Sequence, residues 1–445
     1  MVFFCAINMK PMEVIEVGLT QSAQLSKVGN VILGEREEFI ITLPPEKRNV
    51  IVFGGDAFNR TEGYVKNEIR QAIKRRESLI ITGDQDLYES MSGKLMDYGY
   101  EVRVVGRSGW DCIRDLKGSD AQVVAHQISE TLLFDAAPYA ELHHILLKSV
   151  CLHVALDLPE DMCGLGTVYG MLIDISRKED VLELRLADSS LAKEAYRVFL
   201  DAIYESGSNV SDVACELVDM LRAVQRIPTL RLADSRPLRL ETVSKRLCAY
   251  FCIIDQKDNA SSRLQNTLFI SSALTWLKTI KREPQRRQMI DTNITVNFLL
   301  NDFTSLGGIP DWEWLLAALT GTPGINTSLI FNDVKQMMKM YAGVADVLMT
   351  ACDTWLFMGT GDDDVAKFVA DASKAFRSAD MQLYFDNDGE WAFSDMGDAK
   401  MSIRPITEKS VLSLPQNKVI ALRKGFGAIR LNRFGYSKYN MYNAI

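Results

Sequence analysis

A buried strand that ends in two glycines constrains the fold of this chain most strongly. Residues 48–55, RNVIVFGG, form an apolar, β-branched run, and residues 61–78 follow with apolar positions at helical spacing. A second strand-like run at 79–83, a helical stretch at 87–99 and a third strand-like run at 100–105 come next. Because strands that alternate with helices favour a parallel sheet covered by helices, we expect an α/β fold.

The middle of the chain carries helical periodicity only. From Asp120 to about residue 232, apolar residues recur at helical spacing and no strand-like run separates the helices. Ser211 or Asp212 is placed to cap one of these helices. Strand-like runs resume at residues 248–254. An all-α segment is therefore expected to interrupt the α/β fold.

These changes of pattern predict the domain organisation. A chain of 445 residues is long for one core, which favours an insertion or a second domain. We expect a lead-in at residues 1–29, an α/β domain built from residues 30–119 and 233–445, and an all-α insertion domain at residues 120–232.

The α/β pattern continues to the C-terminus. Pro310 suits the first turn of a helix that carries Trp312 and Trp314. Trp312 lies on the apolar stripe of that helix and is expected in the core, whereas Trp314 lies off the stripe and could face a neighbouring subunit. Further on, MQLYFDNDGEWAFSD at residues 381–395 predicts a β-hairpin rather than a calcium loop, with its turn at residues 387–389.

The charge of the chain limits the classes of partner. A net charge of −8 and a pI near 5.3 argue against binding nucleic acid by overall charge. Local basic clusters do occur, and a solvated surface is their simplest interpretation. They are Lys74 with Arg75 and Arg76; Lys281 and Arg282 with Arg286 and Arg287; and Arg423 and Lys424 with Arg430 and Arg433.

The cysteines predict a reduced protein. Eight cysteines without a repeated C-x-x-C pattern are typical of buried thiols in a cytosolic protein, and Cys248 and Cys252 lie in an apolar run. Cys151, His153 and Cys163 form the most metal-like group, but their spacing matches no recognised zinc ligand set, so we expect no zinc site there.

No stretch predicts a membrane span. The N-terminal MVFFCAINM is too short to cross a bilayer and lacks the basic start and cleavage site of a secretion signal. We expect a cytoplasmic protein, with peripheral attachment to the inner face of the cell membrane as an alternative.

The octapeptide GGDAFNRT occupies the place of a phosphate-binding loop. Such a loop follows a strand as G-x-x-x-x-G-K-[ST] and opens a helix, so that backbone N–H groups surround the phosphates and the lysine reaches them. Gly54 and Gly55 begin this stretch and Thr61 ends it, but Asn59 stands for the second glycine and Arg60 for the lysine. Asn tolerates positive φ and Arg pairs with phosphate, so neither change is decisive by itself.

Two further changes weaken the match. Asp56 would place a carboxylate beside the phosphates, where like charges repel. At the end of the strand FLLND, Asn301 and Asp302 replace the acidic pair that many nucleotide hydrolases use for Mg²⁺ and the attacking water. Because adjacent strand residues point to opposite faces, we do not expect Asp302 to take over the metal position. If Mg²⁺ binds at all, Thr61 and Asp302 are its expected contacts.

The order of these pieces resembles the TraG-type conjugative coupling proteins of type IV secretion systems, which are RecA-like P-loop ATPases with an inserted all-α domain. The resemblance covers residues 29–440. It is carried by NVIVFGGDAFNRTEGYVKNEI, LLNDFTSLGGIPDWEWLLAAL, SLIFNDVKQMMKMY, CDTWLFMG and IRPITEKSVLSLPQNKVIALRKGFGAIRLNRFGY.

This chain departs from the family mainly at positions that carry chemistry. Besides Arg60, Asn301 and Asp302, Asn332 stands where the family carries a sensing glutamine and Thr320 where it carries an arginine. The membrane-spanning helices that usually precede the first strand are also missing from this sequence.

The resemblance and its departures together imply a pseudo-ATPase. We expect a scaffold or adaptor for conjugative DNA or protein transfer, with no catalytic residue, no required cofactor and a vestigial phosphate loop. ATP and Mg²⁺ are its ligands only if the site still functions. An active, divergent ATPase motor for export and a DNA-binding module without ATPase activity are the alternatives.

The resemblance implies its partners as well. Other secretion or conjugation components are expected, through the all-α domain, together with self-association; DNA is the weakest candidate.

Overall fold

The structure is a computed structural model, and not every residue of the chain is described. The described residues are 18–21, 29–36, 39–43, 49–116, 120–134, 141–179, 181–186, 190–227, 238–254, 259–282, 294–310, 324–342, 345–376, 383–385, 391–393, 402–403, 406–424 and 427–438.

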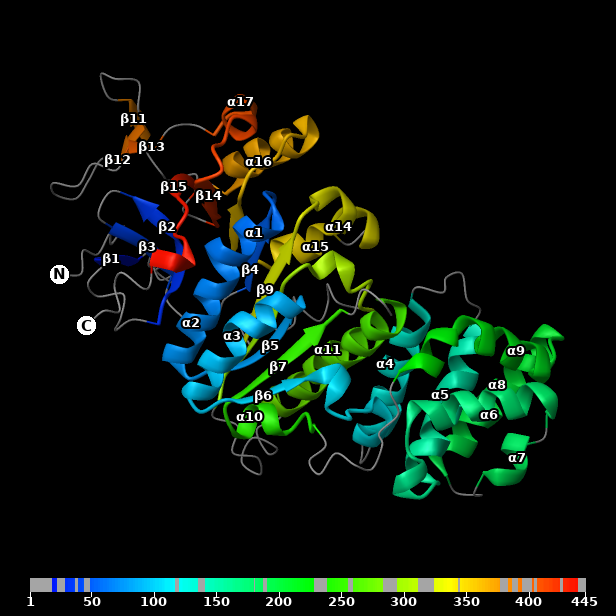
Figure 1. Ribbon diagram of the computed structural model, residues 1–445. Coiled ribbons are helices and arrows are strands. Elements are labelled where there is room, and N and C mark those ends of the chain that lie inside the picture. The colour runs from blue at the N-terminus through cyan, green and yellow to red at the C-terminus, as the bar shows by residue number, and fades with distance from the viewer. Residues whose placement is uncertain are drawn as a thin grey trace.

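A twelve-stranded sheet organises the molecule (Figure 1), in the order β1-β3-β2-β15-β14-β10-β4-β9-β8-β5-β7-β6. The strands from β10 to β6 in this order pair in parallel, as the alternation of strands and helices predicts. They are β4 Asn49–Phe53, β5 Ser78–Gly83, β6 Glu101–Val104, β7 Cys248–Ile253, β8 Val296–Leu300, β9 Ile325–Phe331 and β10 Thr354–Phe357. The α/β prediction is confirmed for this part of the sheet.

The other end of the sheet is antiparallel, which the sequence interpretation missed. β14 pairs antiparallel with β10, and β15, β2, β3 and β1 extend the sheet in the same manner. These strands are β1 Gly18–Gln21, β2 Val31–Arg36, β3 Phe39–Leu43, β14 Lys418–Arg423 and β15 Gly427–Asn432. Part of the predicted lead-in thus forms a strand at the edge of the sheet.

Alternate residues of the central strand enter separate cores. Ile51 and Phe53 of β4 belong to one hydrophobic cluster, and Val50 and Val52 belong to another. Since neighbouring side chains of a strand point to opposite faces, both faces of β4 are covered. The helices that accompany this sheet are α1 Ala57–Arg60, α2 Lys66–Arg75, α3 Gln85–Asp97, α11 Asn259–Arg282, α14 Val334–Met340, α15 Ala345–Thr350 and α16 Asp363–Ala375. A π-helical turn, Thr61–Val65, joins α1 to α2.

Helices fill the stretch between β6 and β7. α5 packs on α4 and α8, and α6 packs on α9. α5 to α9 lie at one end of the molecule, far from the small β11–β13 sheet (Figure 1). The bounds are α4 Ala121–Leu133, α5 Glu141–Leu156, α6 Leu165–Arg177, α7 Val181–Arg185, α8 Leu191–Ser206 and α9 Val210–Met220. The predicted helical character is present, but the predicted cap of α9 is wrong: Asn209 accepts hydrogen bonds from the N–H groups of Ser211 and Asp212.

Phe134, at the end of α4, packs against the backbone that follows β8. A Cβ atom built on Gly308 would lie 1.6 Å from Cε1 of the Phe134 ring. The absence of a side chain at Gly308 therefore allows this close approach between the helical segment and the sheet.

We expect Gly308→Ala to lower the free energy of unfolding by about 1–3 kcal/mol, because the ring must leave its position to admit the methyl group. Denaturant unfolding measures this. Gly170→Ala is the matched control, since nothing lies within 4 Å of the added Cβ on α6, and it should be neutral or stabilising by up to about 1 kcal/mol. In a protein that already carries Phe134→Ala, Gly308→Ala should cost little, because the ring that it would meet is gone. An equal loss of stability from Gly308→Ala in both backgrounds would contradict the assignment.

The predicted hairpin is described in the structure only in part, and the predicted tryptophan positions are not described. β11 Leu383–Phe385 pairs antiparallel with β12 Trp391–Phe393, which confirms the hairpin, and β13 Ser402–Ile403 adds a third strand. The predicted turn at residues 387–389 lies outside the described residues, as do Trp312 and Trp314. None of the described helices is long and apolar enough to cross a bilayer.

Candidate functional site

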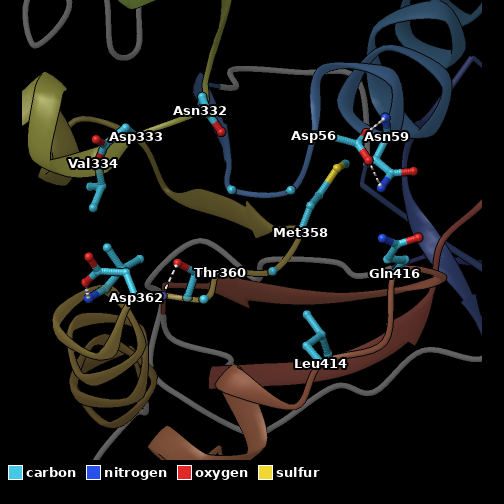
Figure 2. Close-up of a pocket in the computed structure, with 15 residues that line it drawn as sticks. Asp56, Asn59, Asn332, Asp333, Val334, Met358, Thr360, Asp362, Leu414 and Gln416 are labelled. Atoms are coloured by element: carbon cyan, nitrogen blue, oxygen red, sulfur yellow. Dashed lines mark hydrogen bonds between the residues drawn. The ribbon is translucent and has the colours of Figure 1, made fainter.

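A cavity of about 550 Å³ lies at the carboxyl ends of β4, β9 and β10 (Figure 2). Ligands of parallel α/β sheets bind at this edge, and the volume is sufficient for a small-molecule ligand. Its lining comes from the turn after β4, the residues after β9 and β10, and the stretch before β14. The main polar contributors are Asp56, Asn59, Asn332, Asp333, Thr360 and Asp362.

The turn after β4 is fixed by its neighbours. Gly54 and Gly55 have φ values of 76° and 64°, which favour glycine. The N–H of Gly54 donates to the carbonyl of Asn332 at 3.3 Å, and that of Gly55 donates to the carbonyl of Gly359 at 2.7 Å. A Cβ on Gly54 would lie 2.4 Å from the Gly359 oxygen. These two N–H groups therefore form hydrogen bonds within the fold.

A helix begins where a phosphate loop would continue. α1 starts at Ala57, so only Gly54, Gly55 and Asp56 separate it from β4. Asp56 caps this helix: Oδ1 accepts the N–H of Asn59 at 2.6 Å, and Oδ2 accepts Nδ2 of Asn59 at 3.0 Å (Figure 2). Its carboxylate occupies one backbone N–H group at the start of α1, that of Asn59, which an anion at this position would also use.

Asn59 does not fill the role of the missing glycine. It lies within α1, and the positive-φ residues other than glycine among those described are Arg76 and Asp302. The tolerance of Asn for positive φ, which the sequence suggested as a remedy, is therefore not used. Instead the side-chain oxygen of Asn59 accepts a hydrogen bond from Arg433.

Arg60 points into the fold. Its side chain is buried, with the residue 4% exposed. Nη1 donates to the carbonyls of Gly54 at 3.1 Å and Gly55 at 2.7 Å, and to Oδ1 of Asn332 at 3.2 Å. Burial lowers the pKa of Arg60, and the nearby Asp302 and Asp56 oppose that shift. Arg60 thus links the turn after β4 to Asn332, the residue that follows β9.

The charge of the cavity is acidic. Asp56 lies on one side, and Asp333 and Asp362 lie on the other (Figure 2). No lysine or arginine is among the described residues that line it. Two like charges about 4 Å apart repel by roughly 4 kcal/mol at an effective dielectric constant of about 20. Asp362 is paired with Lys335 at 2.8 Å, whereas Asp56 lies beside the turn after β4, where its carboxylate would repel a phosphate.

The expected metal contacts do not line this cavity, although Asp302 acts electrostatically on Arg60 beside it. Neither Thr61 nor Asp302 is among its lining residues. Asn301 and Asp302 follow β8 in a turn, and Asp302 is left-handed, with φ 55°. The expectation that they alternate as strand residues is therefore wrong. Asp302 Oδ2 accepts the hydroxyl of Ser305 at 2.5 Å, and the carbonyl of Asn301 accepts the hydroxyl of Thr82 at 2.5 Å.

The sequence interpretation missed part of the cavity wall. Met358, Gly359, Thr360, Gly361 and Asp362 follow β10 and line it. A strand followed by GTGDDD at 359–364 is the signal that could have identified them, because small residues and a capping aspartate are typical of the turn from a strand to a helix. Asp362 does cap α16 through the N–H groups of Asp364 and Val365.

Thr320 and the group of Cys151, His153 and Cys163 are not among the described residues that line the cavity. Thr320 lies outside the described residues. Cys163 donates its thiol to the carbonyl of Val154, and His153 pairs with Asp157 at 2.8 Å. Burial raises the pKa of Cys151 to about 12, which keeps the thiol protonated. Cys163 and His153 thus interact with other groups of the fold.

The basic clusters are used within the fold. Arg75 is buried between carboxylates, and Arg423 donates to the hydroxyl of Thr354 at 2.5 Å. Lys424 and Arg430 donate to the carbonyls of Thr350 and Ser410. The side chains of the second cluster, at residues 281–287, are not described. These contacts reduce the support for a DNA-binding surface.

A family model and solved structures match this chain. Residues 295–375 match the model described as the TraM recognition site of TraD and TraG. The conjugative coupling protein TrwBdeltaN70, in a trigonal form with sulphate, superimposes with a TM-score of 0.61 over 96% of each chain at 13% identity. Residues 295–375 therefore resemble the TraM recognition segment of TraD and TraG, and the whole chain shares the fold of the conjugative coupling protein.

Other solved structures show the same fold. TrwB in complex with ADP and Mg²⁺ matches with a TM-score of 0.57, at 12% identity over 87% of this chain and 85% of that one. VirB4 of Thermoanaerobacter pseudethanolicus matches with a TM-score of 0.57, at 10% identity over 93% of this chain and 98% of its own. The likeness to these solved structures confirms the predicted RecA-like P-loop NTPase fold. No curated protein matches the sequence.

Proposed function

We propose that this TraG-type protein is a coupling-protein-like component of a conjugative or type IV secretion apparatus, and that it works as a scaffold or adaptor without hydrolysing ATP. The type of apparatus rests on the TraM-recognition match and on the likeness to TrwB and VirB4. The absence of hydrolysis rests on one observation: Asp56 and Arg60 complete the turn after β4 by themselves.

The internal bonds of this turn support the proposal. Phosphoryl transfer depends on positioned N–H groups, a cation at the phosphates and a metal held by acidic residues. Here the cation is directed at Gly54 and Gly55, and a carboxylate caps the helix that would hold the phosphates. Binding a triphosphate would require these contacts to break and Asp56 to leave the cavity.

The divergent-motor alternative predicts turnover that needs Arg60 and Asp302. We expect phosphate release by the wild-type protein to equal that of buffer with ATP and Mg²⁺, and Arg60→Ala and Asp302→Ala to leave that level unchanged. A coupled phosphate-release assay measures this. Turnover above buffer that both substitutions abolish would establish the motor and contradict the scaffold.

Partners are proposed for the helical segment. We propose that residues 120–232 form an inserted all-α domain that contacts other transfer components, and that the protein is cytoplasmic or peripheral to the inner membrane face. The position of α5 to α9 at one end of the molecule supports this, because it leaves these helices apart from the sheet (Figure 1). Pull-down with residues 120–232 replaced by a short linker would test it; unchanged capture of transfer components would contradict it.

A further inference from the structure

Three side chains with metal-binding atoms meet between α4 and α5. They are His126 and Glu130 of α4 and His144 of α5, and one ligand atom from each lies within 4.8 Å of the others. His126 and Glu130 are four residues apart, so they share one face of α4. The cluster is far from the cavity in the sequence and belongs to the helical segment.

The geometry of the cluster is set by His144. Its ring is buried, and Nε2 lies 3.2 Å from Oε1 of Glu130 and 2.9 Å from Oγ of Ser129. The rings of His126 and His144 are 4.5 Å apart between centroids and nearly perpendicular. Ser129 Oγ lies 2.9 Å from the carbonyls of Ala125 and His126, to which it donates. His144 and Glu130 are thus already within contact distance.

The ligands of a metal ion at this cluster would be two imidazoles and one carboxylate. A neutral imidazole is the form that donates its lone pair to a metal ion. Lys148 is the cationic side chain that acts on this site from α5.

We propose that His126, Glu130 and His144 bind one divalent transition-metal ion, with Zn²⁺ as the ion of choice. Two imidazoles and one carboxylate are a ligand set that zinc accepts, and water would fill the fourth position. Ligand atoms around tetrahedral zinc lie about 3.3 Å apart. His126 is exposed, so its side chain can turn to close the remaining distance and leaves an entry path. The bound ion would tie α4 to α5.

The other histidines provide an internal contrast. The chain has four histidines. His143 pairs with Glu216 at 2.7 Å, and His153 pairs with Asp157 at 2.8 Å. Each of these pairs brings together one imidazole and one carboxylate, which is too few ligands for a specific site, whereas the α4–α5 cluster brings together three groups.

Calorimetric titration of the full-length protein with ZnCl₂, after treatment with EDTA and its removal, tests the proposal. We expect one saturable site and a rise in Tm on adding Zn²⁺. His126→Ala and Glu130→Gln should weaken binding by at least about 100-fold, because loss of even an outer-shell partner typically costs 10- to 100-fold. Mg²⁺ should give no response at the same concentration, because it prefers oxygen ligands in octahedral geometry.

Matched controls separate this site from others on the surface. Glu205→Gln on α8 changes an exposed glutamate of the same helical segment and should leave the Zn²⁺ affinity unchanged. Cys215→Ser removes the exposed thiol among the described cysteines and should also leave it unchanged. No saturable Zn²⁺ binding, or binding of equal strength in His126→Ala, would overturn the proposal.

Discussion

Arg75→Ala is expected to lower the free energy of unfolding by about 3–5 kcal/mol. Nη2 of Arg75 lies 2.5 Å from Oε1 of Glu68 and 2.8 Å from Oε2 of Glu77, and these side chains are 7%, 1% and 5% exposed. Burial alone would lower the pKa of Arg75, but the two glutamates raise it. Without the guanidinium, two carboxylates stay buried side by side without their cation, which is the costly way to break a buried ion pair.

The same cluster fastens α2 to the amino ends of two strands. Nδ2 of Asn297, on β8, donates to Glu68 at 2.8 Å and to Glu77 at 3.2 Å, and Nδ2 of Asn326, on β9, donates to Glu77 at 3.2 Å. Loss of Arg75 is therefore expected to affect the central sheet as a whole. It lies at the opposite edge from the cavity, so the effect is one of stability.

Chemical denaturation of Arg75→Ala beside Arg222→Ala measures the effect. Arg222 forms an exposed pair with Asp219, so its removal should change stability by no more than about 0.5 kcal/mol. Arg75→Met combined with Glu68→Gln and Glu77→Gln should recover part of the loss, because no net charge is then buried. A loss below about 1 kcal/mol in Arg75→Ala would contradict this account.

Arg60→Ala is expected to lower the free energy of unfolding by about 2–3 kcal/mol. The substitution removes a buried donor from the carbonyls of Gly54 and Gly55 and from the amide of Asn332. Hydrogen bonds to a charged group contribute about 1.5–3 kcal/mol each in favourable cases, and the substitution leaves these three acceptors without their donor. These partners belong to the protein itself, so the arginine contributes to the fold whether or not a phosphate is bound.

Thermal and denaturant unfolding distinguish the two roles of Arg60. Lys66→Ala is the control from the following helix, where Lys66 forms a partly exposed pair with Glu62 four residues earlier; it should cost about 0.5 kcal/mol or less. Unchanged or increased stability of Arg60→Ala would mean that the arginine is poised for a ligand.

The sequence predicted the elements better than their arrangement. Val50, Ile51 and Val52 gave a clear buried strand, because both faces of β4 enter cores. The order of strands could not be predicted, because a continuous apolar run carries no information about which strand lies beside it. The antiparallel pairing of β14 with β10 depends on contacts between segments more than 50 residues apart in the sequence, such as Thr354 opposite Arg423.

The predicted phosphate loop lines the described cavity, but the sequence interpretation of its side chains was too simple. Asp56 was treated as a charge beside a phosphate, whereas its main role is to cap α1. A capping aspartate before a short helix is itself a sequence signal, but the glycines before it favoured the phosphate-loop interpretation. The inward turn of Arg60 depends on Asn332, which is far away in the sequence and lies beside β4 only because β9 pairs with it.

Calorimetric titration of the wild-type protein with ATP and Mg²⁺ tests the central claim most directly. Asp56→Gly combined with Asn59→Gly and Arg60→Lys is the matched variant, because it restores the loop pattern and removes the carboxylate cap. We expect no saturable heat from the wild-type protein up to millimolar ATP, because the turn after β4 is closed by its own side chains and its cavity is acidic. One-to-one binding by the wild-type protein at micromolar ATP would contradict it.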